Sequence, residues 1–568
     1  MKYPQDYRQS NESNLWVPAS GAADFAYSDG SAQEQYLEQC VQQATDRSSL
    51  ASGLIRHIRD WSSEYHLTPK RGNLLRPLGL ESVGSVLELG AGCGAVTRYL
   101  GENVDRVVAV EGSHQRAKVA ALRCRDLTNV EVVCGNFQDV EFEQQFDMVT
   151  LIGVLEYSGK YIESSEPYIE ALTLAKRHLK PDGVLVIAIE NKLGIKYFSG
   201  CTEDHTGVYY DGIEGYGIGS NVRTFGKREL ATLLNEAGLP HTKFMYPFPD
   251  YKLPDMVVVN EDSLSMAERP FLYSWVGHAS FRDYANIERR KAFDEFLAIK
   301  QLESNGLLGD LANSFLVVAS ANEASVTSAV PSDLVLQKYS VTRRRKFMTK
   351  ISVRHSDTDG LQVVRESLDN GVATKASNLN KTLEHTIEPA QPLYTGITLM
   401  ERMINAIRRM DVNPLNAFQA EMAAWDTYLR GQALALTGSE EELPGDYLDC
   451  VPSNLICTDE GIKYIDREWS YRERLPVKFI LYRGLFHFYS VMHPMIDACW
   501  SPMGVSVDHQ GFIGIGLDSI KRGLTLEELA EYQKLEQGFL ARTLPYVPKG
   551  PGTMTRQTTQ RDAARKAS

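Results

Sequence analysis

The stretch VLELGAGCG, residues 86–94, decides the fold of the first half of this 568-residue chain. An apolar, strand-like run ends in a glycine-rich turn, and residues 95–100 continue with the spacing of a helix. Glycine in such a turn permits a tight bend and lets the backbone approach a ligand that a Cβ atom would exclude. The stretch therefore predicts a ligand-binding loop at the end of a first strand.

Strand-like and helical runs alternate on the C-terminal side of this loop. The predicted strands are residues 85–89, 106–110, 130–134, 147–152 and 184–190. The predicted crossover helices are residues 95–100, 115–126 and 168–179, and a last pair of strands is expected within 241–260. Such alternation predicts an α/β fold, a Rossmann-like doubly wound sheet with both faces covered by helices.

Length and composition indicate more than one folded unit. The chain is 43% hydrophobic and 23% charged, which is typical of globular proteins, and it exceeds the usual size of one domain. We expect an N-terminal extension, the sheet domain, a helical connector, a second α+β unit and a disordered tail. Their predicted bounds are 1–48, 49–262, 263–312, 313–545 and 546–568.

Charge and cysteine usage limit the classes of partner. A net charge of -13 disfavours a broad nucleic-acid surface, because such surfaces hold phosphates with Lys and Arg. The basic run at residues 343–346 is either a solvated face or a local phosphate or lipid contact. Scattered cysteines and the absence of a secretory signal at the start predict a cytoplasmic protein. Residues 479–492 predict a core helix, so any membrane association is expected to be peripheral.

The strand after the loop narrows the identity of the ligand. It ends in Glu111, twenty-one residues after Gly90, where a carboxylate can accept hydrogen bonds from both hydroxyls of a ribose. A dinucleotide enzyme shares this geometry, so an NAD-dependent oxidoreductase stays open on spacing alone. The form E-x-G-x-G-x-G at residues 88–94, however, resembles motif I of class I methyltransferases rather than G-x-G-x-x-G.

This resemblance implies S-adenosylmethionine as the cofactor. Glu88 matches the family position that orients the methionine end, and residues 135–137 match the loop that contacts adenine. The later landmarks at residues 152–157 and 179–183 follow in the family's order. The implied cofactor-binding residues are Glu88, Gly90, Gly92, Gly94, Glu111, Asn136, Phe137, Ile152 and Glu156.

The methyl acceptor is expected near the loops that follow the fourth and fifth strands, since ligands of open α/β sheets bind outside the carboxyl ends of the strands. His205 is the candidate general base, because an unperturbed histidine titrates near neutral pH. Arg223, Lys192 and Lys196 are candidates for holding an anionic acceptor. The alternative is that these polar groups only fix the loop.

Four segments carry a narrower resemblance. EDHTG at 203–207, GIEGY at 212–216, RTFGK at 223–227 and YPFPDYKLP at 246–254 together resemble methyltransferases of bacterial surface-polysaccharide biosynthesis. Among these are O-antigen chain-terminating enzymes that join a methyltransferase to a kinase. The resemblance implies a saccharide or saccharide-phosphate acceptor. A small-molecule acceptor and a non-catalytic scaffold that binds S-adenosylmethionine are the open alternatives.

The second unit carries the spacing of a kinase catalytic loop, D-x-x-P-x-N, at residues 449–454. In phosphoryl transfer Asp449 would position the acceptor hydroxyl, and Asn454 and Asp466 would hold Mg²⁺. Lys338, on a predicted strand, would pair with the phosphates of ATP.

The match to aminoglycoside-kinase-like families is incomplete. No glycine-rich loop precedes Lys338, Tyr447 stands where the family has His, and residues 466–468 read DRE instead of DFG. Residues 396–401 still resemble the hinge segment of small-molecule kinases. The sequence therefore predicts a kinase-like fold, either an active kinase that uses ATP and Mg²⁺ or a degenerate module that binds the acceptor.

Overall fold

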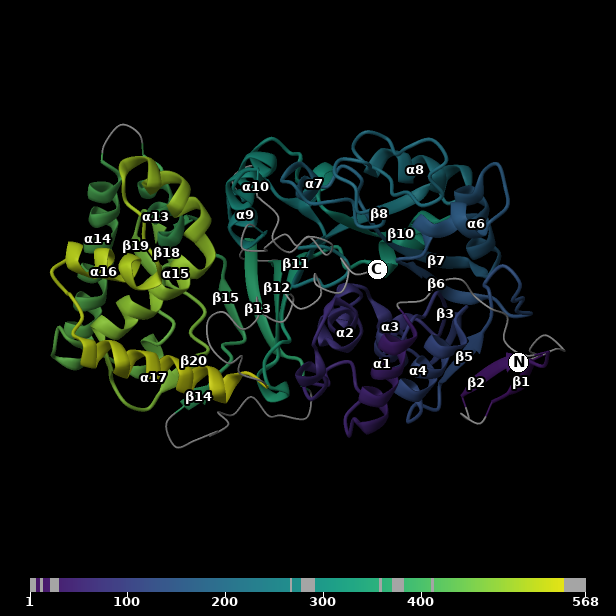
Figure 1. Cartoon of the computed structure of the whole chain (residues 1–568), viewed down its shortest axis with the longest axis horizontal. Coiled ribbons are helices and arrows are strands. Elements are labelled where there is room, and N and C mark those ends of the chain that lie inside the picture. Colours follow the sequence, from purple (N-terminus) through teal and green to yellow (C-terminus); the bar gives the residue numbers. More distant parts are fainter. Residues whose placement is uncertain are drawn as a thin grey trace, which may run out of the picture.

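The computed structural model describes residues 7–10, 14–20, 30–265, 268–276, 292–356, 360–369, 383–409 and 413–545. An N-terminal body, coloured purple to teal, and a C-terminal body, coloured green to yellow, lie side by side (Figure 1). The disordered tail predicted at 546–568 lies outside the described residues, as does the part of the predicted connector at 277–291.

A five-stranded parallel sheet forms the centre of the N-terminal body. β3 (Ser85–Leu89) lies between β4 (Arg106–Glu111) and β6 (Phe146–Ile152), with β5 (Val130–Cys134) beyond β4 and β7 (Leu179–Glu190) beyond β6. The strand order therefore runs away from β3 in both directions, which opens a crevice at the carboxyl ends of β3 and β6. This arrangement confirms the predicted Rossmann-like doubly wound sheet.

Helices cover both faces of the sheet, and the strands are buried on both sides. Alternate residues of each strand join two separate apolar layers, with Leu87 in one and Val86 in the other. α4 (His114–Cys124) contributes its alanines to the layer of Val86, and α6 (Pro167–Arg177) packs in the layer of Leu87. The other helices of this body are α3 (Ala95–Gly101), α5 (Ser158–Tyr161), α7 (Ile195–Phe198), α8 (Lys227–Glu236), α9 (Pro270–Val276), α10 (Glu295–Ser304), α11 (Leu308–Leu311) and α12 (Glu323–Ala329).

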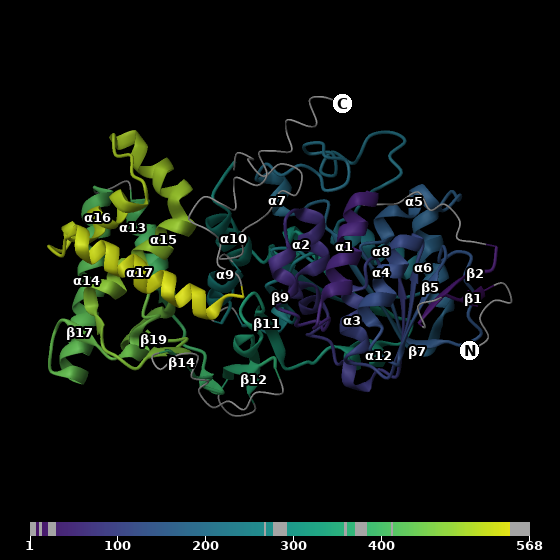
Figure 2. The same ribbon diagram turned by 60° about the horizontal axis from the view of Figure 1, so that its bottom comes forward.

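The N-terminal extension is part of this body. β2 (Leu15–Pro18) pairs in parallel with β5 and carries β1 (Tyr7–Gln9) on its outer edge. α1 (Ser31–Gln43) packs on α4, and α1, α2 (Trp61–Leu67) and α4 lie together on one side of the body (Figure 2). The 3₁₀ turns of the region are η1 (Leu54–His57), η2 (Pro69–Leu74), η3 (Leu80–Ser82), η4 (Leu155–Tyr157) and η5 (Glu261–Ser263).

One strand of the sheet comes from beyond the predicted boundary. β10 (Ser314–Ser320) lies between β7 and β8 (His241–Phe248) and is antiparallel to both. All of its residues are buried, as expected for an interior strand. The second unit predicted at 313–545 therefore begins too early, because an apolar run by itself does not say which sheet it joins.

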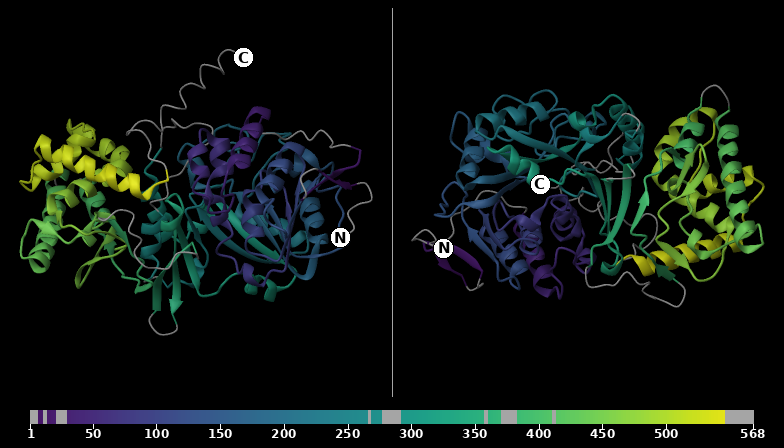
Figure 3. Two further views of the ribbon diagram at one scale, coloured as in Figure 1. Left: turned by 90° about the horizontal axis from the view of Figure 1, so that it is seen from below. Right: turned by 180° about the vertical axis from the view of Figure 1, so that it is seen from behind.

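One continuous hydrogen-bonded sheet extends from the first body toward the second. β9 (Met256–Val258) pairs with both β8 and β11 (Leu334–Ser340), and the sheet continues through β12 (Thr349–Ser356), β13 (Gly360–Ser367) and β15 (Ala390–Pro392). Seen from behind, teal strands stand between the blue and the yellow-green parts (Figure 3). The two bodies are thus joined through β8, β9 and β11.

The C-terminal body is mainly helical. Its helices are α13 (Leu399–Ile407), α14 (Pro414–Thr437), α15 (Val477–Trp500), α16 (His509–Ser519) and α17 (Leu526–Thr543). Its short strands are β14 (Leu383–His385), β16 (Ile397–Thr398), β17 (Glu442–Leu443), β18 (Leu455–Thr458), β19 (Gly461–Tyr464), β20 (Trp469–Tyr471) and β21 (Leu475–Pro476), and its 3₁₀ turns include η7 (Gly445–Tyr447) and η8 (Pro452–Asn454). Across the described residues, no helix has the length and apolar character needed to cross a membrane.

Candidate active site

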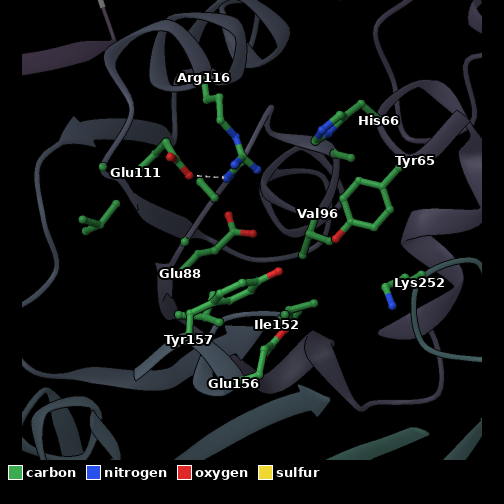
Figure 4. Close-up of a pocket in the computed structure, with 18 of the residues that line it drawn as sticks. Tyr65, His66, Glu88, Val96, Glu111, Arg116, Ile152, Glu156, Tyr157 and Lys252 are labelled. Carbon is green, nitrogen blue, oxygen red and sulfur yellow. Dashed lines mark hydrogen bonds between the residues drawn. The ribbon is translucent and has the colours of Figure 1, made fainter. Parts of the chain in front are cut away.

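A cavity of about 290 Å³ opens at the carboxyl ends of β3, β4 and β6 (Figure 4). The glycine-rich loop lines it with Gly90 and Gly92, whose φ angles are 84° and 56°. Gly94, with φ 75°, instead packs behind the loop, where a Cβ would lie 2.7 Å from Ala120 Cα of α4. Glycine is required at these positions because side chains rarely adopt such φ angles and because neighbours stand close.

Glu111 ends β4 and holds the loop in shape. One carboxylate oxygen accepts a hydrogen bond from the Gly92 N–H at 2.7 Å, and the other accepts from the Ser113 N–H at 3.0 Å. The side chain also lines the cavity. Glu111 is thus fixed at the place where a ribose carboxylate contact is expected.

Glu88 lies at the base of the cavity and is 2% exposed. The Thr97 hydroxyl donates a hydrogen bond to its carboxyl at 2.5 Å. Burial, partly offset by this hydrogen bond and by Arg71, raises the pKa of Glu88 to about 8. A buried carboxyl of this kind favours a cationic partner in the cavity, such as an ammonium group.

The remaining predicted cofactor residues gather in the same place. Asn136 and Phe137 reach the cavity from the loop after β5, Ile152 from the end of β6 and Glu156 from η4. The sequence motifs therefore identify side chains and loops that the fold brings to one cavity.

Other lining residues were not among the predicted cofactor-binding residues, although some of them lie in segments that carry the family resemblance. Figure 4 shows Tyr65 and His66 of α2, with Lys252, along one side of the cavity, while Glu88 and Glu111 lie along the other. The further residues are Trp61, Ser62, Arg71, Arg116, Tyr157, Tyr161, Asp204 and Tyr251. The aromatic and basic pair Tyr251-Lys252, inside a proline-rich turn, was the available signal.

His205 enters the cavity wall from the loop after β7. Its Nδ1 lies 3.0 Å from Glu203 Oε1, and its Nε2 lies 3.7 Å from Glu156 Oε1 and 3.8 Å from Glu190 Oε2. Burial alone would lower the pKa of His205, but Glu190, Glu156 and Glu203 outweigh it and raise the pKa well above its usual value. The surroundings favour positive charge here, unlike those of the neutral base expected from the sequence.

The buried Lys196 and the half-buried Lys252 join this group of carboxylates. Lys196 Nζ lies 2.7 Å from Asp204 Oδ2, and Lys252 Nζ lies 2.5 Å from the same oxygen and also contacts Glu190. Burial opposes the charge of Asp204, but Lys196 and Lys252 outweigh it and lower the pKa of Asp204. The lysine predicted to hold an anionic acceptor is therefore engaged inside the protein.

The other two predicted cationic groups are also engaged. Lys192 Nζ pairs with Glu229 at 2.7 Å. The Arg223 guanidinium lies over the rings of Tyr168 and Phe225, at 5.9 and 5.2 Å from their centres, and the Arg223 N–H donates to the Glu156 carbonyl at 3.1 Å. Arg223 thus anchors the loop beside the cavity.

A second cavity, of about 240 Å³, lies between strands β11, β12 and β13 and the C-terminal helices α13 and α15. Three residues predicted from the kinase-like spacing line it: Lys338 of β11, Asn454 of η8 and Asp466 after β19. Asp466 adopts a positive φ of 60°, and its Oδ1 lies 3.3 Å from the Arg365 guanidinium.

Asp449 is held by a buried arginine. Arg483 of α15 contacts Asp449 Oδ1 at 2.8 Å and also pairs with Glu536 of α17. Burial disfavours the charge of Arg483, but these two carboxylates outweigh it and raise the pKa of its guanidinium. The side-chain amide of Asn454 donates to the Asp449 carbonyl at 3.0 Å. This hydrogen bond links the two ends of the loop at residues 449–454.

Comparisons with known proteins concern the first body. A family model described as a methyltransferase domain matches residues 87–187. An uncharacterized methyltransferase of Staphylococcus carnosus is 26% identical over 181 residues, covering 28% of this chain and 83% of the relative. The cypemycin N-terminal methyltransferase of a Streptomyces species is 35% identical over 99 residues, covering 17% of this chain and 39% of the relative.

Solved structures also match. The N-methyltransferase NodS from Bradyrhizobium japonicum, in complex with S-adenosylhomocysteine, is 18% identical and has a TM-score of 0.20, covering 28% of this chain and 74% of that one. A SAM-dependent methyltransferase from Thermotoga maritima is 15% identical, with a TM-score of 0.27, and covers 49% of this chain and 100% of that one. The family match covers residues 87–187, which include the glycine-rich loop and most of the parallel sheet, and it supports a methyltransferase domain in this part of the chain.

Proposed function

We propose that the protein transfers a methyl group from S-adenosylmethionine to a saccharide hydroxyl. The observation that carries this proposal is that the cofactor loop and the loop after β7 line one cavity, so Glu88 and Glu111 share it with Glu156 and His205. A methyl group delivered there would meet an acceptor without leaving the cavity. Near-attack positioning of this kind is the main protein contribution to such a transfer.

The charges of the cavity favour a neutral face of the acceptor over a phosphate. Lys192 and Lys196 are engaged with carboxylates, and the Arg223 guanidinium lies over aromatic rings. Buried acidic groups, among them Glu156, lie at the acceptor side. A saccharide hydroxyl can donate to such carboxylates, whereas a phosphate would be repelled. The aromatic lining at Tyr157, Tyr161 and Tyr251 suits the apolar face of a sugar ring.

His205 and Arg223 have different parts in this proposal. His205 faces the acceptor from the cavity wall, and Arg223 positions Glu156 through the backbone. Glu111 holds the ribose, and Glu88 holds the amino group of the methionine end.

The test is the rate of S-adenosylhomocysteine formation with three acceptors: an unphosphorylated oligosaccharide, its phosphorylated form and a peptide with a free N-terminal amine. We expect turnover with the first, no gain from the phosphate, and loss of turnover in Glu111→Gln. Glu131→Gln, on β5 and paired with Arg106, is the matched control. Turnover with the amine alone would replace the saccharide by an amine acceptor, and cofactor binding without any turnover would favour the scaffold.

A second function is favoured by the second cavity, where we propose that ATP binds with Mg²⁺. Lys338, Asn454 and Asp466 line this cavity, whose apolar wall includes Met400 and Ile456. Asp466 Oδ1 is buried and accepts no hydrogen bond from the described residues, and its one ion pair among them is the 3.3 Å contact with Arg365. Carboxylate and amide oxygens are the ligands that Mg²⁺ prefers, so Asp466 and Asn454 fit the ion, and Lys338 fits a phosphate.

Phosphoryl transfer would also require Asp449, which Arg483 holds in an ion pair. We therefore propose nucleotide binding as the basal property, with transfer dependent on release of Asp449. Titration with a fluorescent ATP analogue and Mg²⁺ tests this: binding is expected in the wild type and lost in Lys338→Met and Asp466→Asn. Lys350→Met, on the neighbouring strand β12, is the control. Equal binding by all variants would refute the site.

A further inference from the structure

The acceptor side of the first cavity holds three side chains arranged as ligands of one cation. We infer that Glu156, Glu190 and His205 form a binding site for a divalent metal ion beside the cofactor cavity. Their nearest ligand atoms all lie within 4.8 Å of one another. Two ligands of one ion, at bond lengths of about 2.1 Å, are about 3.0 to 4.2 Å apart. Nε2 of His205, at 3.7 and 3.8 Å from the two carboxylates, already meets this spacing.

One oxygen of each buried carboxylate has no hydrogen-bond donor among the described side chains. Glu156 is 1% exposed and Glu190 is fully buried, and the Oε2 atom of each accepts no hydrogen bond from any described residue. Lys252 contacts the other oxygen of Glu190 and is shared with Asp204. Buried carboxylate oxygens without partners are costly, and a metal ion is one of the few ways to compensate them.

His205 is oriented as metal-binding histidines are. The 3.0 Å contact between its Nδ1 and Glu203 Oε1 places the ring proton on Nδ1, donated to Glu203. Nε2 then faces the oxygens of Glu156 and Glu190, and a positive charge between these three atoms, either a proton on Nε2 or a metal ion, removes the repulsion of their lone pairs. The separations of 3.7 and 3.8 Å exceed hydrogen-bond length, so these contacts leave room for an ion. A carboxylate that fixes the second nitrogen of a ligating histidine is a recurrent feature of metal sites.

The ligand set indicates which ions fit. One imidazole nitrogen and two carboxylates suit Zn²⁺ or Mn²⁺, whereas Ca²⁺ and Mg²⁺ prefer sites made of oxygen alone. Three protein ligands leave coordination positions open, and because Glu156 and His205 line the cavity, these positions face it. The ion would hold an acceptor oxygen there. That use rests on the proposed methyl transfer, but binding of the ion does not.

The experiment is a titration of the full-length, chelator-treated protein with MnCl₂, followed by the electron paramagnetic resonance signal of free Mn²⁺. We expect one bound ion per chain. The spectrum of the bound ion should show nitrogen hyperfine coupling from His205, and this coupling should disappear in His205→Gln. Glu190→Gln should weaken binding at least tenfold. Glu203→Gln keeps all three ligands but weakens the support of the histidine ring and of the loop at Thr206, and should weaken binding about 10- to 100-fold. Glu229→Gln, which changes a carboxylate paired with Lys192 nearer the surface, is the matched control and should bind as the wild type does.

A parallel titration with S-adenosylhomocysteine separates this inference from the proposed function. Should Glu190→Gln fail to fold, Glu203→Gln carries the test, because it leaves all three ligands in place. The metal site is overturned if the wild type binds neither Mn²⁺ nor Zn²⁺ at millimolar concentration. It is equally overturned if folded Glu190→Gln and Glu203→Gln bind as tightly as Glu229→Gln. If the metal site is overturned but the wild type binds S-adenosylhomocysteine, the proposed methyl transfer is unaffected. If the wild type does not bind S-adenosylhomocysteine, the proposed methyl transfer is refuted and the metal site is not.

Discussion

Replacing Glu88 by glutamine is expected to stabilise the folded protein while weakening cofactor binding. Burial, partly offset by Thr97 and Arg71, raises the pKa of Glu88 from 4.5 to about 8. The folded protein therefore holds a proton that the unfolded chain releases between pH 4.5 and pH 8. Because the folded state binds more protons in this window, the free energy of unfolding falls as pH rises through it.

The pKa shift gives the size of the effect. Each pKa unit corresponds to about 1.4 kcal/mol, so holding the proton at pH 7, about 2.5 units above the unfolded pKa, costs the folded state about 3 kcal/mol. The glutamine amide keeps a carbonyl oxygen that accepts from Thr97 and carries no charge. We expect Glu88→Gln to gain up to about 3 kcal/mol at pH 7 and almost nothing at pH 4.

Urea denaturation from pH 4 to pH 9 measures this difference in unfolding midpoint. Glu81→Gln, an exposed carboxylate of η3, is the control and should follow the wild type at each pH. A Glu88→Gln midpoint at or below that of the wild type at pH 8 would refute the reasoning, as would a gap that does not widen with pH. Calorimetry should also show wild-type affinity for S-adenosylhomocysteine rising about fivefold from pH 7 to pH 8, as the carboxylate ionises, and no such rise in the variant.

Three further substitutions test other parts of the structure. Gly94→Ala should reduce the free energy of unfolding by about 1 to 3 kcal/mol and lower the melting temperature, because Gly94 has a positive φ and lies against α4. A melting curve equal to that of Gly217→Ala, at a position with open space, would contradict this. Glu111→Gln should weaken S-adenosylhomocysteine binding about 10- to 100-fold in calorimetry, since charged hydrogen bonds are lost, and a change below threefold would count against the ribose contact. Arg483→Met removes the arginine from the buried Glu536 and leaves it, among the described residues, only the contact with His487, so it should cost about 3 to 5 kcal/mol in urea denaturation, whereas an unchanged midpoint would show that the pair adds nothing.

Local patterns predicted most of the central sheet. β3 to β7 fall where apolar runs alternate with helical spacing, because each strand and its crossover helix are neighbours along the chain. β10 could not be assigned, since its partner β7 lies far away in the sequence and its apolar run fits any buried sheet position. β2 was missed for another reason: four residues are too few to show a period.

The sequence also predicted only part of each candidate site. Glu88 and Glu111 follow from a single motif and its spacing, whereas Tyr65 and Lys252 reach the same cavity from segments far from that motif, and nothing in their own sequence indicates the cofactor. The spacing from 449 to 466 likewise brought Asn454 and Asp466 to one cavity. It gave no sign of Arg483, because a pair between a loop and a later helix is visible only once the helices have packed.

The position of β10 has a consequence for synthesis of the chain on the ribosome. About 120 residues separate the end of β7 from β10, its neighbour in the sheet. At about 5 to 20 residues per second, β7 would wait about 6 to 25 seconds after its own synthesis for this partner to be made. During that interval the strand presents an unpaired, apolar edge, which is a template for association with other chains. Slow translation between residues 190 and 314 is therefore expected to lower the yield of folded protein, and chaperones that bind nascent chains should raise it.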